Sequence, residues 1–433
     1  MKDFIVSLYW RGMIHDMVPG TAAHLNEGMA TGYVGFDPSA PSLHLGNLVP
    51  IMLLKHFQEA GHKPIALVGG ATGMIGDPSG RSQERVFLTE EVLRHNEASI
   101  AKQLEKFLDF SSGPNKAILL NNFDWFKDFS FLGFLRDIGK HIPVGYMMAK
   151  DSVKKRIETG ISYTEFAYQL LQGYDFYHLH LHKNVTLQMG GSDQWGNLTT
   201  GVELIRKKSQ CHAFAITAPL LTRSDGTKFG KTDAGTNIWL DPAQTSPYEL
   251  YQFLLNSGDH EVEKLIKIFS FGKKEEVEAL ILTHQSKPEA RLLQQTLAKI
   301  VTTMVHSESD CRQAIICSNI LFNHTASIDA LYALSEEDIL RVCTTIPKVH
   351  ITRIALSAID SIVSLLSVAT ENFIMDSKSE ARRVIESGGI KVNKVLITDP
   401  YQKPDFILLH NRYLLVQKGK KITTLLLLLS NFF

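Results

Sequence analysis

The first 220 residues alternate apolar runs of strand length with longer stretches of helical periodicity. This order predicts βαβ units, because two parallel strands need a long crossover between them, which is usually a helix. We expect strands at residues 29–35, 64–70, 116–122 and 185–191, and a first crossover helix at 43–60. The fold class is therefore α/β, with a doubly wound parallel sheet.

The rest of the chain changes character twice. At about 100–200 residues per domain, 433 residues predict two to four domains. We expect a parallel-sheet domain at 1–221, a polar mobile loop at 222–236, a helical domain at 237–346, a small α+β domain at 356–421 and an apolar tail at 422–433. In the small domain, Ser377 and Glu380 have capping-box spacing before a basic helix that ends at Gly388, and the strand IKVNKVL follows.

Composition limits the possible partners. The chain has 45 basic and 45 acidic residues, so any nucleic-acid surface must be local; residues 376–421 hold ten basic and five acidic ones. The four cysteines form no CxxC pair, which favours a reducing compartment. No apolar run reaches the roughly 20 residues of a membrane span, and no secretory signal is evident. We therefore expect a cytoplasmic protein without a membrane partner.

Three loops rich in glycine and polar residues follow expected strands, at 35–47, 69–85 and 189–197. Because parallel strands end at one edge of a sheet, these loops predict a binding site there. The first loop contains the motif HLGN (44–47), at the start of the crossover helix. Free N–H groups and the helix dipole favour phosphate at such a position. Taken alone, the motif is more often an ordinary polar helix start.

A second motif is KFGKT (228–232). Its two lysines, three residues apart beside a glycine, suit a loop that closes over a polyphosphate. Cationic donors there would stabilise the charge that develops on a leaving pyrophosphate. Taken alone, such a charged loop is more often a solvated surface segment.

Together the two motifs are far more specific. HLGN and KFGKT resemble the HIGH and KMSKS signatures of the class I aminoacyl-tRNA synthetases. The chain resembles the bacterial tyrosyl-tRNA synthetase family over nearly its whole length, in the phrases GYVGFDPSAPSLHLGN, GDPSGR, SYTEFAYQLLQGYDF and QMGGSDQWGN. The resemblance implies a Rossmann-like catalytic domain, a helical anticodon-side domain and a homodimer with contacts near 125–160.

The resemblance implies a reaction in two steps. The carboxylate of L-tyrosine attacks the α-phosphate of ATP, pyrophosphate leaves, and the tyrosyl group then passes to the 3′ end of tRNA(Tyr). Neither a covalent nucleophile nor a general base is required, so positioning and electrostatics would carry the catalysis. We expect Mg²⁺ to accompany ATP and no metal to be bound by the protein itself.

The resemblance also implies residue roles. Tyr33 and Asp175 would bind the phenolic hydroxyl of tyrosine, and such a buried site disfavours phenylalanine because its polar groups would be left unpaired. The rest of the amino acid would be bound by Asp77, Tyr168, Gln172 and Gln188. ATP and the transition state would be bound by Gly35, Asp37, His44, Gly46, Asn47, Arg81, Arg85, Gly191, Asp193, Lys228, Lys231 and Thr232. The spacing of Tyr168, Gln172 and Asp175 independently places them on one helix face.

The last domain resembles the small RNA-binding fold named after a ribosomal small-subunit protein, in the phrase SKSEARRVIESGGIKVNK. The resemblance implies that Arg382, Arg383, Lys391 and Lys394 contact RNA phosphates. The affinity would then depend on salt. A merely solvated basic face is the alternative.

Two positions depart from the family pattern. Asn47 replaces the second histidine of HIGH, although its amide can still donate, and Arg81 stands where a lysine is frequent. The alternatives are a tryptophan-specific sibling, a small-molecule nucleotidyltransferase and a catalytically inactive RNA-binding homologue. Tyr33 with Asp175, the length of the extra domains and the lysines of KFGKT argue against them in turn.

Three histidines alternate in the sequence YHLHLHK, at His178, His180 and His182. On a strand all three would share one face and could bind zinc or copper. Cys or carboxylate partners at ligand spacing are lacking, so a strand face beside the sheet is the stronger hypothesis.

Overall fold

Six strands form one sheet in the N-terminal half of the chain, in the order β1-β6-β5-β2-β3-β4. They are β1 (Asp16–Met17), β2 (Thr31–Phe36), β3 (Lys63–Val68), β4 (Ile118–Asn121), β5 (Val185–Gly191) and β6 (Phe214–Ala218). All neighbours pair in parallel except β1, which is antiparallel to β6. The predicted parallel sheet is confirmed. The strand order reverses between β2 and β5, and sheets of this kind bind ligands at such a point.

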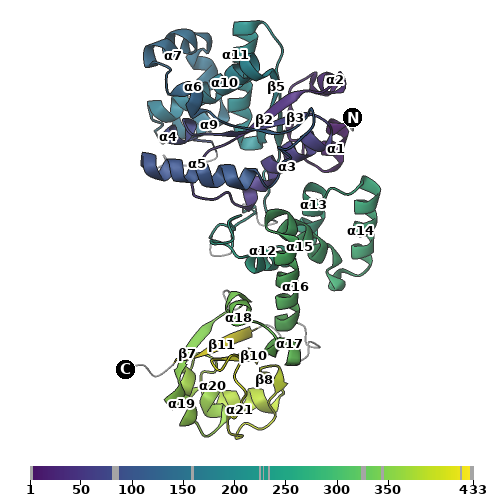
Figure 1. Ribbon diagram of the computed structural model, residues 1–433, viewed down its shortest axis with the longest axis vertical. Coiled ribbons are helices and arrows are strands. Elements are labelled where there is room, and N and C mark those ends of the chain that lie inside the picture. The colour runs from purple at the N-terminus through teal and green to yellow at the C-terminus, as the bar shows by residue number, and fades with distance from the viewer. Residues whose placement is uncertain are drawn as a thin grey trace. The chain divides into compact units, whose positions relative to one another are not determined.

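Helices cover both faces of this sheet (Figure 1). The computed structural model describes residues 3–79, 87–157, 160–223, 226–227, 229–232, 235–322, 328–342, 346–419 and 422–429. Helix α3 (Leu48–Glu59) packs on β2, β3 and β5, and α10 (Tyr163–Lys183) and α11 (Trp195–Ser209) pack on each other and on the opposite face. A Cβ on Gly201 would lie 2.9 Å from the Phe176 side chain, so only glycine allows this close packing of α10 and α11.

The prediction for the three histidines is wrong in its secondary structure. Helix α10 continues to Lys183 and ends at Asn184, which has a left-handed backbone with φ 54°. On this helix His178 and His182 share a face, whereas His180 lies on a different face. The Nδ1 of His180 lies 2.9 Å from the Val185 carbonyl. The alternation of histidine and leucine imitates a strand, but the helical periodicity of the whole segment decides the fold.

The remaining helices of the described chain are shorter or lie C-terminal to the sheet. They are α1 (Phe4–Trp10), α2 (Thr21–Asn26), α4 (Thr72–Ile75), α5 (Glu90–Leu104), α6 (Phe123–Phe126), α7 (Phe131–Asp137), α8 (Val144–Met148), α9 (Asp151–Ile157), α12 (Pro247–Leu255), α13 (Asp259–Phe269), α14 (Lys274–Ser286), α15 (Leu292–Val305), α16 (Glu308–Phe322), α17 (Ile328–Tyr332), α18 (Glu336–Val342), α19 (Arg353–Ser357), α20 (Ile362–Leu366) and α21 (Lys378–Glu386). Single 3₁₀ turns occur at Leu45–Asn47, Gly139–His141, Ser192–Gln194, Pro288–Ala290 and Val368–Thr370. None of the described helices combines the length and hydrophobicity that a bilayer span requires.

The chain forms two compact units, and the expected helical domain is divided between them. The first unit contains residues 1–245 and 253–306, and the second contains 246–252 and 307–433. Helices α13 to α15 belong to the first unit, where the buried Arg11 guanidinium donates to the carbonyls of Lys267, Ser270 and Gly272 near the end of α13. These bonds satisfy carbonyls that a helix end leaves unpaired, which explains why the segment joins the sheet domain.

The second unit contains a five-stranded sheet in the order β7-β11-β10-β8-β9. Its strands are β7 (Lys348–Thr352), β8 (Ile390–Val392), β9 (Val395–Leu396), β10 (Tyr413–Lys418) and β11 (Ile422–Leu429). Residues 422–429, expected to be an apolar tail outside the domain, therefore form an internal strand between β7 and β10. Leu425 and Leu426 are both buried, because an internal strand covered on both faces favours consecutive apolar residues. The domain thus begins at β7 and includes the leucine run.

The Ser377 cap of α21 is confirmed, whereas the reciprocal bond of Glu380 goes to Asp376, one residue before the position that a capping box uses. Ser377 accepts a bond from the Glu380 backbone at 3.2 Å, and Glu380 accepts from the Asp376 backbone at 2.9 Å, at the start of α21. The expected single strand IKVNKVL is instead the hairpin of β8 and β9. Its two-residue turn, Asn393 and Lys394, has φ values of 45° and 71°, as a tight hairpin turn requires.

Candidate active site

A cavity of about 650 Å³ lies at the carboxyl ends of β2 and β5, where the strand order reverses. Its lining includes Tyr33, Gly35, Asp37, His44, Gly46, Asn47, Asp77, Tyr168, Gln172, Asp175, Gln188, Gly191, Asp193 and Lys231. All of these residues were assigned to the amino acid or ATP by the sequence analysis. Thr232 does not line the cavity, and its hydroxyl accepts a bond from the Thr236 backbone at 3.2 Å. Arg81, Arg85 and Lys228 lie outside the described residues.

Asp175 is a buried carboxylate on α10, only 2% exposed. Its Oδ1 accepts from the Trp125 indole at 2.9 Å, and its Oδ2 accepts from the Asn122 amide at 3.0 Å. Burial raises the pKa of Asp175 to about 8, while the two hydrogen bonds favour the charged form and oppose that shift. An acidic group with two fixed donors is suited to recognise a ligand hydroxyl.

Three buried polar atoms of the lining have no hydrogen-bond partner among the described residues. They are the Tyr33 hydroxyl and the amide oxygens of Gln172 and Gln188. Burial, and then the charge of Asp175, raise the pKa of Tyr33 well above its ordinary value, so its hydroxyl stays neutral and can donate. A buried polar group without a partner costs about 1–3 kcal/mol, so three around one cavity point to a polar ligand that supplies the partners.

Asp37 connects the loop after β2 with two helices. Its Oδ2 accepts from the Tyr168 hydroxyl at 2.7 Å, and its Oδ1 accepts from the Thr72 hydroxyl at 2.7 Å. Burial, followed by the charges of Asp37 and Asp77, raises the pKa of Tyr168 well above its ordinary value. The two carboxylates near Tyr168 make this part of the cavity suited to a cationic group.

Asp77 connects the loop after β3 with the start of α11. Its Oδ2 accepts from the Gln194 amide at 2.6 Å, and its Oδ1 accepts from the Ser79 backbone at 2.9 Å. The Asn197 amide lies 3.4 Å from the same Oδ1. These contacts fix the orientation of the Asp77 carboxylate at the edge of the cavity.

The HLGN motif forms a capped turn at the start of α3. His44 Nδ1 accepts from the Gly46 backbone at 3.1 Å, and Asn47 Oδ1 accepts from the His44 backbone at 3.0 Å. A neutral imidazole that accepts at Nδ1 carries its proton on Nε2. Since the oxygen of Asn47 takes part in the cap, its NH₂ group is the side that can donate to a ligand. The replacement of histidine by Asn47 therefore keeps a donor at this position.

The described part of KFGKT packs against this turn. The Gly230 carbonyl accepts from the Ile238 backbone at 2.9 Å, and the Ile238 carbonyl accepts from the Leu45 backbone at 2.8 Å. Gly230 has φ 97°, and a Cβ there would lie 3.2 Å from the Gly46 nitrogen. Glycine at position 230 thus allows the two backbones to approach, and Lys231 lines the shared cavity. The predicted mobility of the loop stays a prediction.

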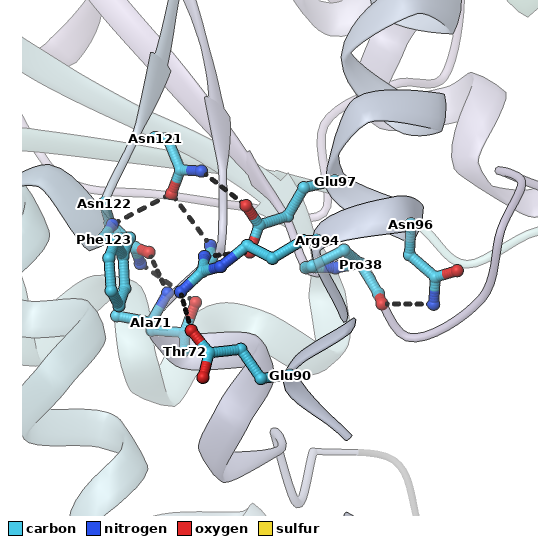
Figure 2. Close-up of polar contacts among 11 residues, drawn as sticks. Pro38, Ala71, Thr72, Glu90, Arg94, Asn96, Glu97, Asn121, Asn122 and Phe123 are labelled. Carbon is cyan, nitrogen blue, oxygen red and sulfur yellow. Dashed lines mark hydrogen bonds and ion pairs between the residues drawn. The ribbon is translucent and has the colours of Figure 1, made fainter. Parts of the chain in front are cut away.

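Several residues that position the site were not predicted from the sequence. Asn122 and Trp125 bind Asp175, Thr72 binds Asp37, and Gln194 binds Asp77. Asn122 is the last residue of the strand expected at 116–122, so its place at the binding edge of the sheet was a usable signal (Figure 2). The indole contact of Trp125 had no such signal, because it depends on packing against α10.

The histidine pair of α10 lies behind this site. The His178 ring stacks on Trp125 at 4.5 Å and lies 4.4 Å from the His182 ring. Burial, and then the charges of His182 and Lys183, lower the pKa of His178 to about 4, so it is neutral at pH 7. Within the described residues, no three His, Cys, Asp or Glu side chains are grouped so as to hold a metal ion.

The candidate RNA-binding residues lie on α21 and on the β8–β9 hairpin. Arg382 pairs with Glu386 at 2.8 Å and lies over the Tyr401 ring, whereas Arg383 is exposed on the same helix. Burial, and then the charge of Lys391, lower the pKa of Lys394 to about 8. The four cations come from elements adjacent in sequence, and their contact with RNA stays a prediction.

Comparisons with known proteins identify the family. A family model described as tRNA synthetases class I (W and Y) matches residues 25–323, and one described as the tyrosine–tRNA ligase SYY-like C-terminal domain matches 338–426. The tyrosine–tRNA ligase of Amoebophilus asiaticus is 59% identical, over 97% of this chain and 98% of that protein. The tyrosine–tRNA ligase of Porphyromonas gingivalis is 54% identical, over 97% and 98% respectively.

A solved structure agrees with these sequence matches. The C-terminally truncated mitochondrial tyrosyl-tRNA synthetase of Aspergillus nidulans matches with a TM-score of 0.67 and 32% identity, over 74% of this chain and 95% of that one. The tryptophanyl-tRNA synthetase of Plasmodium falciparum is 13% identical with a TM-score of 0.52, which shows a shared fold alone. The tryptophan-specific alternative is therefore not supported, and the chain belongs to the tyrosine–tRNA ligase family of class I aminoacyl-tRNA synthetases.

Proposed function

We propose that the cavity binds L-tyrosine beside ATP, joins them as tyrosyl-adenylate with release of pyrophosphate, and donates the tyrosyl group to tRNA(Tyr) in the cytoplasm. The observation that carries this proposal is the trio of buried, unpaired polar atoms on Tyr33, Gln172 and Gln188. A ligand with a hydroxyl at one end and a charged amino-acid group at the other would supply the partners that these atoms lack.

The proposed pose of tyrosine follows from the polar groups of the lining. Its phenolic hydroxyl lies between Tyr33, which donates, and Asp175, which accepts. Its α-ammonium group lies among acceptors, provided by Asp77, by the Tyr168 hydroxyl and by the Gln172 amide oxygen. Phenylalanine would leave Tyr33 and Asp175 unpaired in a buried site, which disfavours its binding.

ATP is proposed to lie over the HLGN turn. The Nε2–H of His44, the NH₂ group of Asn47 and the ammonium of Lys231 are donors that suit phosphate oxygens. We assign Gly35, Asp37, Gly46, Gly191 and Asp193 to the nucleoside side of the cavity. We keep Arg81, Arg85, Lys228 and Thr232 as further triphosphate contacts.

The chemistry then needs no group of the protein to form a bond. The tyrosine carboxylate attacks the α-phosphorus in line, the bond to the bridging oxygen breaks, and pyrophosphate leaves with the electron pair. Cationic donors such as Lys231 act where charge develops, so they stabilise the transition state more than the bound substrates. The phosphate-side residues His44, Asn47 and Lys231 offer nitrogen donors, so Mg²⁺ is expected on ATP oxygens and water.

Two further parts of the proposal concern assembly. The C-terminal domain is proposed to bind tRNA through Arg382, Arg383, Lys391 and Lys394. A second copy of the chain is proposed to cover the segment 125–160, where large apolar side chains such as Leu132, which is 76% exposed, face solvent.

ATP–pyrophosphate exchange tests the proposal directly. The purified chain is assayed with tyrosine, tryptophan and phenylalanine in parallel. Exchange that depends on tyrosine alone supports both the reaction and the assigned pocket. Exchange driven by tryptophan would overturn the roles of Tyr33 and Asp175, and no exchange with any amino acid would contradict catalysis.

A further inference from the structure

Helix α5 carries a polar network that lies outside the cavity and ends on the turn after β4 (Figure 2). Glu97 on this helix is buried. Its Oε1 accepts from Arg94 at 2.6 Å, and its Oε2 accepts from the Asn121 amide at 2.9 Å. The Arg94 guanidinium also lies 3.8 Å from the ring centre of Phe123. In the part of the chain that the structure describes, the cavity lining includes neither Arg94 nor Glu97.

Asn121 converts this helix contact into a fixed turn. Its Oδ1 accepts from the Gly70 backbone at 3.2 Å and from the Phe123 backbone at 2.9 Å. A side chain at position 70 would not fit, since a Cβ there would lie 2.3 Å from Asn121 Oδ1 and 2.8 Å from Glu97 Oε1. The turn is therefore fixed by α5 on one side and by the loop after β3 on the other.

The same turn supplies both donors to Asp175. Asn122 is fully buried, donates to Asp175 at 3.0 Å, and accepts from the Ala71 backbone at 2.7 Å. Trp125, three residues later, donates to the other carboxylate oxygen at 2.9 Å. Hydrogen bonds weaken steeply with poor geometry, so a small displacement of the turn would weaken both contacts at once.

We propose that Arg94 and Glu97 are positioning residues for recognition of the phenolic hydroxyl of the substrate. Their ion pair fixes Asn121, Asn121 fixes the turn, and the turn directs Asn122 and Trp125 at Asp175. This inference rests on the proposed function, in which Asp175 binds that hydroxyl. It extends the specificity-determining part of the site to a helix that does not touch the substrate.

Helix α5 also provides an internal comparison. Gln103, in the last turn of α5, accepts from the Leu43 backbone at 2.9 Å and donates to the Ser42 hydroxyl at 3.0 Å. These bonds support the loop before His44, on the ATP side of the cavity. One helix thus supports the two ends of the cavity through different side chains.

The test uses Glu97→Gln and Arg94→Gln in the full-length chain. The first keeps an oxygen that can accept from Asn121 but removes the charge that pairs with Arg94. The second removes the cation at a side chain that is 30% exposed. For each variant, kcat/KM in ATP–pyrophosphate exchange is measured with tyrosine and with phenylalanine, and the thermal unfolding midpoint is recorded.

We expect kcat/KM for tyrosine to fall roughly three- to tenfold in both variants. Because kcat/KM for phenylalanine should change little, the ratio of the two values should fall. Gln103→Ala is the matched control, because it removes two bonds from the same helix. It should raise the KM for ATP and leave the tyrosine-to-phenylalanine ratio of kcat/KM unchanged. An equal fall for both amino acids in the Glu97 and Arg94 variants would mean a purely structural network and would overturn the inference.

Asp175→Ala separates this inference from the proposed function. If Asp175→Ala leaves the tyrosine-to-phenylalanine ratio intact, the assignment of the hydroxyl to Asp175 fails. If Asp175→Ala narrows the ratio but Glu97→Gln and Arg94→Gln do not, only the inference about α5 fails. A lower tyrosine-to-phenylalanine ratio in all three variants supports both the proposed function and the inference about α5.

Discussion

In the cavity of the first unit, polar groups are buried and fixed by neighbours, as Asp175 is by Asn122 and Trp125. In the C-terminal domain, Arg382 and Arg383 lie on the exposed face of a helix, and the only neighbour that pairs with Arg382 in the described chain is Glu386. Burial makes an unpaired group expensive and therefore selective. Exposed cations attract any phosphate, in a manner that salt screens. The two regions should therefore fail in different ways when changed.

Removal of the C-terminal sheet should have the largest effect, and it tests whether the buried cavity and the exposed cations act separately. A chain that ends before Lys348 loses β7 to β11 and the proposed RNA contacts. We expect tRNA charging to fall by at least roughly 100-fold, because several phosphate contacts are lost. ATP–pyrophosphate exchange should persist, because the cavity is built from the first unit. Loss of exchange as well would show that the domain supports the catalytic unit.

Folding of the shortened chain can be followed independently. All four tryptophans, Trp10, Trp125, Trp195 and Trp239, lie in the first unit. Their fluorescence therefore reports unfolding of the catalytic unit alone. The Aspergillus nidulans relative was crystallised in a C-terminally truncated form, which supports the design.

Lys231→Ala tests the cavity at its reacting end. We expect the rate of adenylate formation to fall roughly 100-fold, because a donor to the transition-state charge is removed. The affinity for tyrosine should change little, since Lys231 lies in the ATP-side motif. Single-turnover kinetics with an independent binding titration measure the two effects. Lys63→Ala is a control at the amino end of β3, and a collapse of tyrosine affinity in Lys231→Ala would contradict the assignment.

Features that depend on nearby residues could be predicted from the sequence, whereas contacts between distant segments could not. The parallel strands, the helix face of Tyr168, Gln172 and Asp175, and the Ser377 cap of α21 were predictable, because periodicity and short spacings determine them. The bonds of Asn122 and Trp125 to Asp175 were not, since they join segments about 50 residues apart, although the place of Asn122 at the sheet edge could have been predicted.

Two errors have a common physical origin. The leucine run of β11 lacks the alternation of a half-exposed strand because both of its faces are covered. The histidines of α10 alternate like a strand although they lie on a helix. In each case a short residue pattern misleads, and the element is decided by a wider context: neighbouring strands for β11 and the periodicity of the whole helix for α10.

A third test asks whether burial raises the pKa of Asp175, as measured by the pH dependence of stability. Its pKa is about 8 in the folded chain against an ordinary 3.8, so its stabilising contribution is complete below pH 3.8 and is lost as the pH rises through 8. Between these values the free energy of unfolding should fall by at most about 1.4 kcal/mol per pH unit relative to Asp175→Asn, which does not titrate. Urea unfolding followed by tryptophan fluorescence from pH 5 to 9 measures this difference. A constant difference across that range would show that Asp175 is ionised throughout.

Arg383→Ala is expected to have the smallest effect, and it examines the other side of the comparison. Loss of one phosphate contact should weaken tRNA binding only roughly threefold and lower the slope of log affinity against log salt by about 1. Arg382 pairs with Glu386 on the same helix, so Glu386→Gln should act oppositely, because it releases a cation for RNA. Filter binding across a salt series measures both slopes, with tyrosine-dependent exchange as the control. If Arg383→Ala weakened binding without altering the slope, the residue would act through local structure, and the contrast between a buried selective site and an exposed electrostatic one would have to be abandoned for this helix.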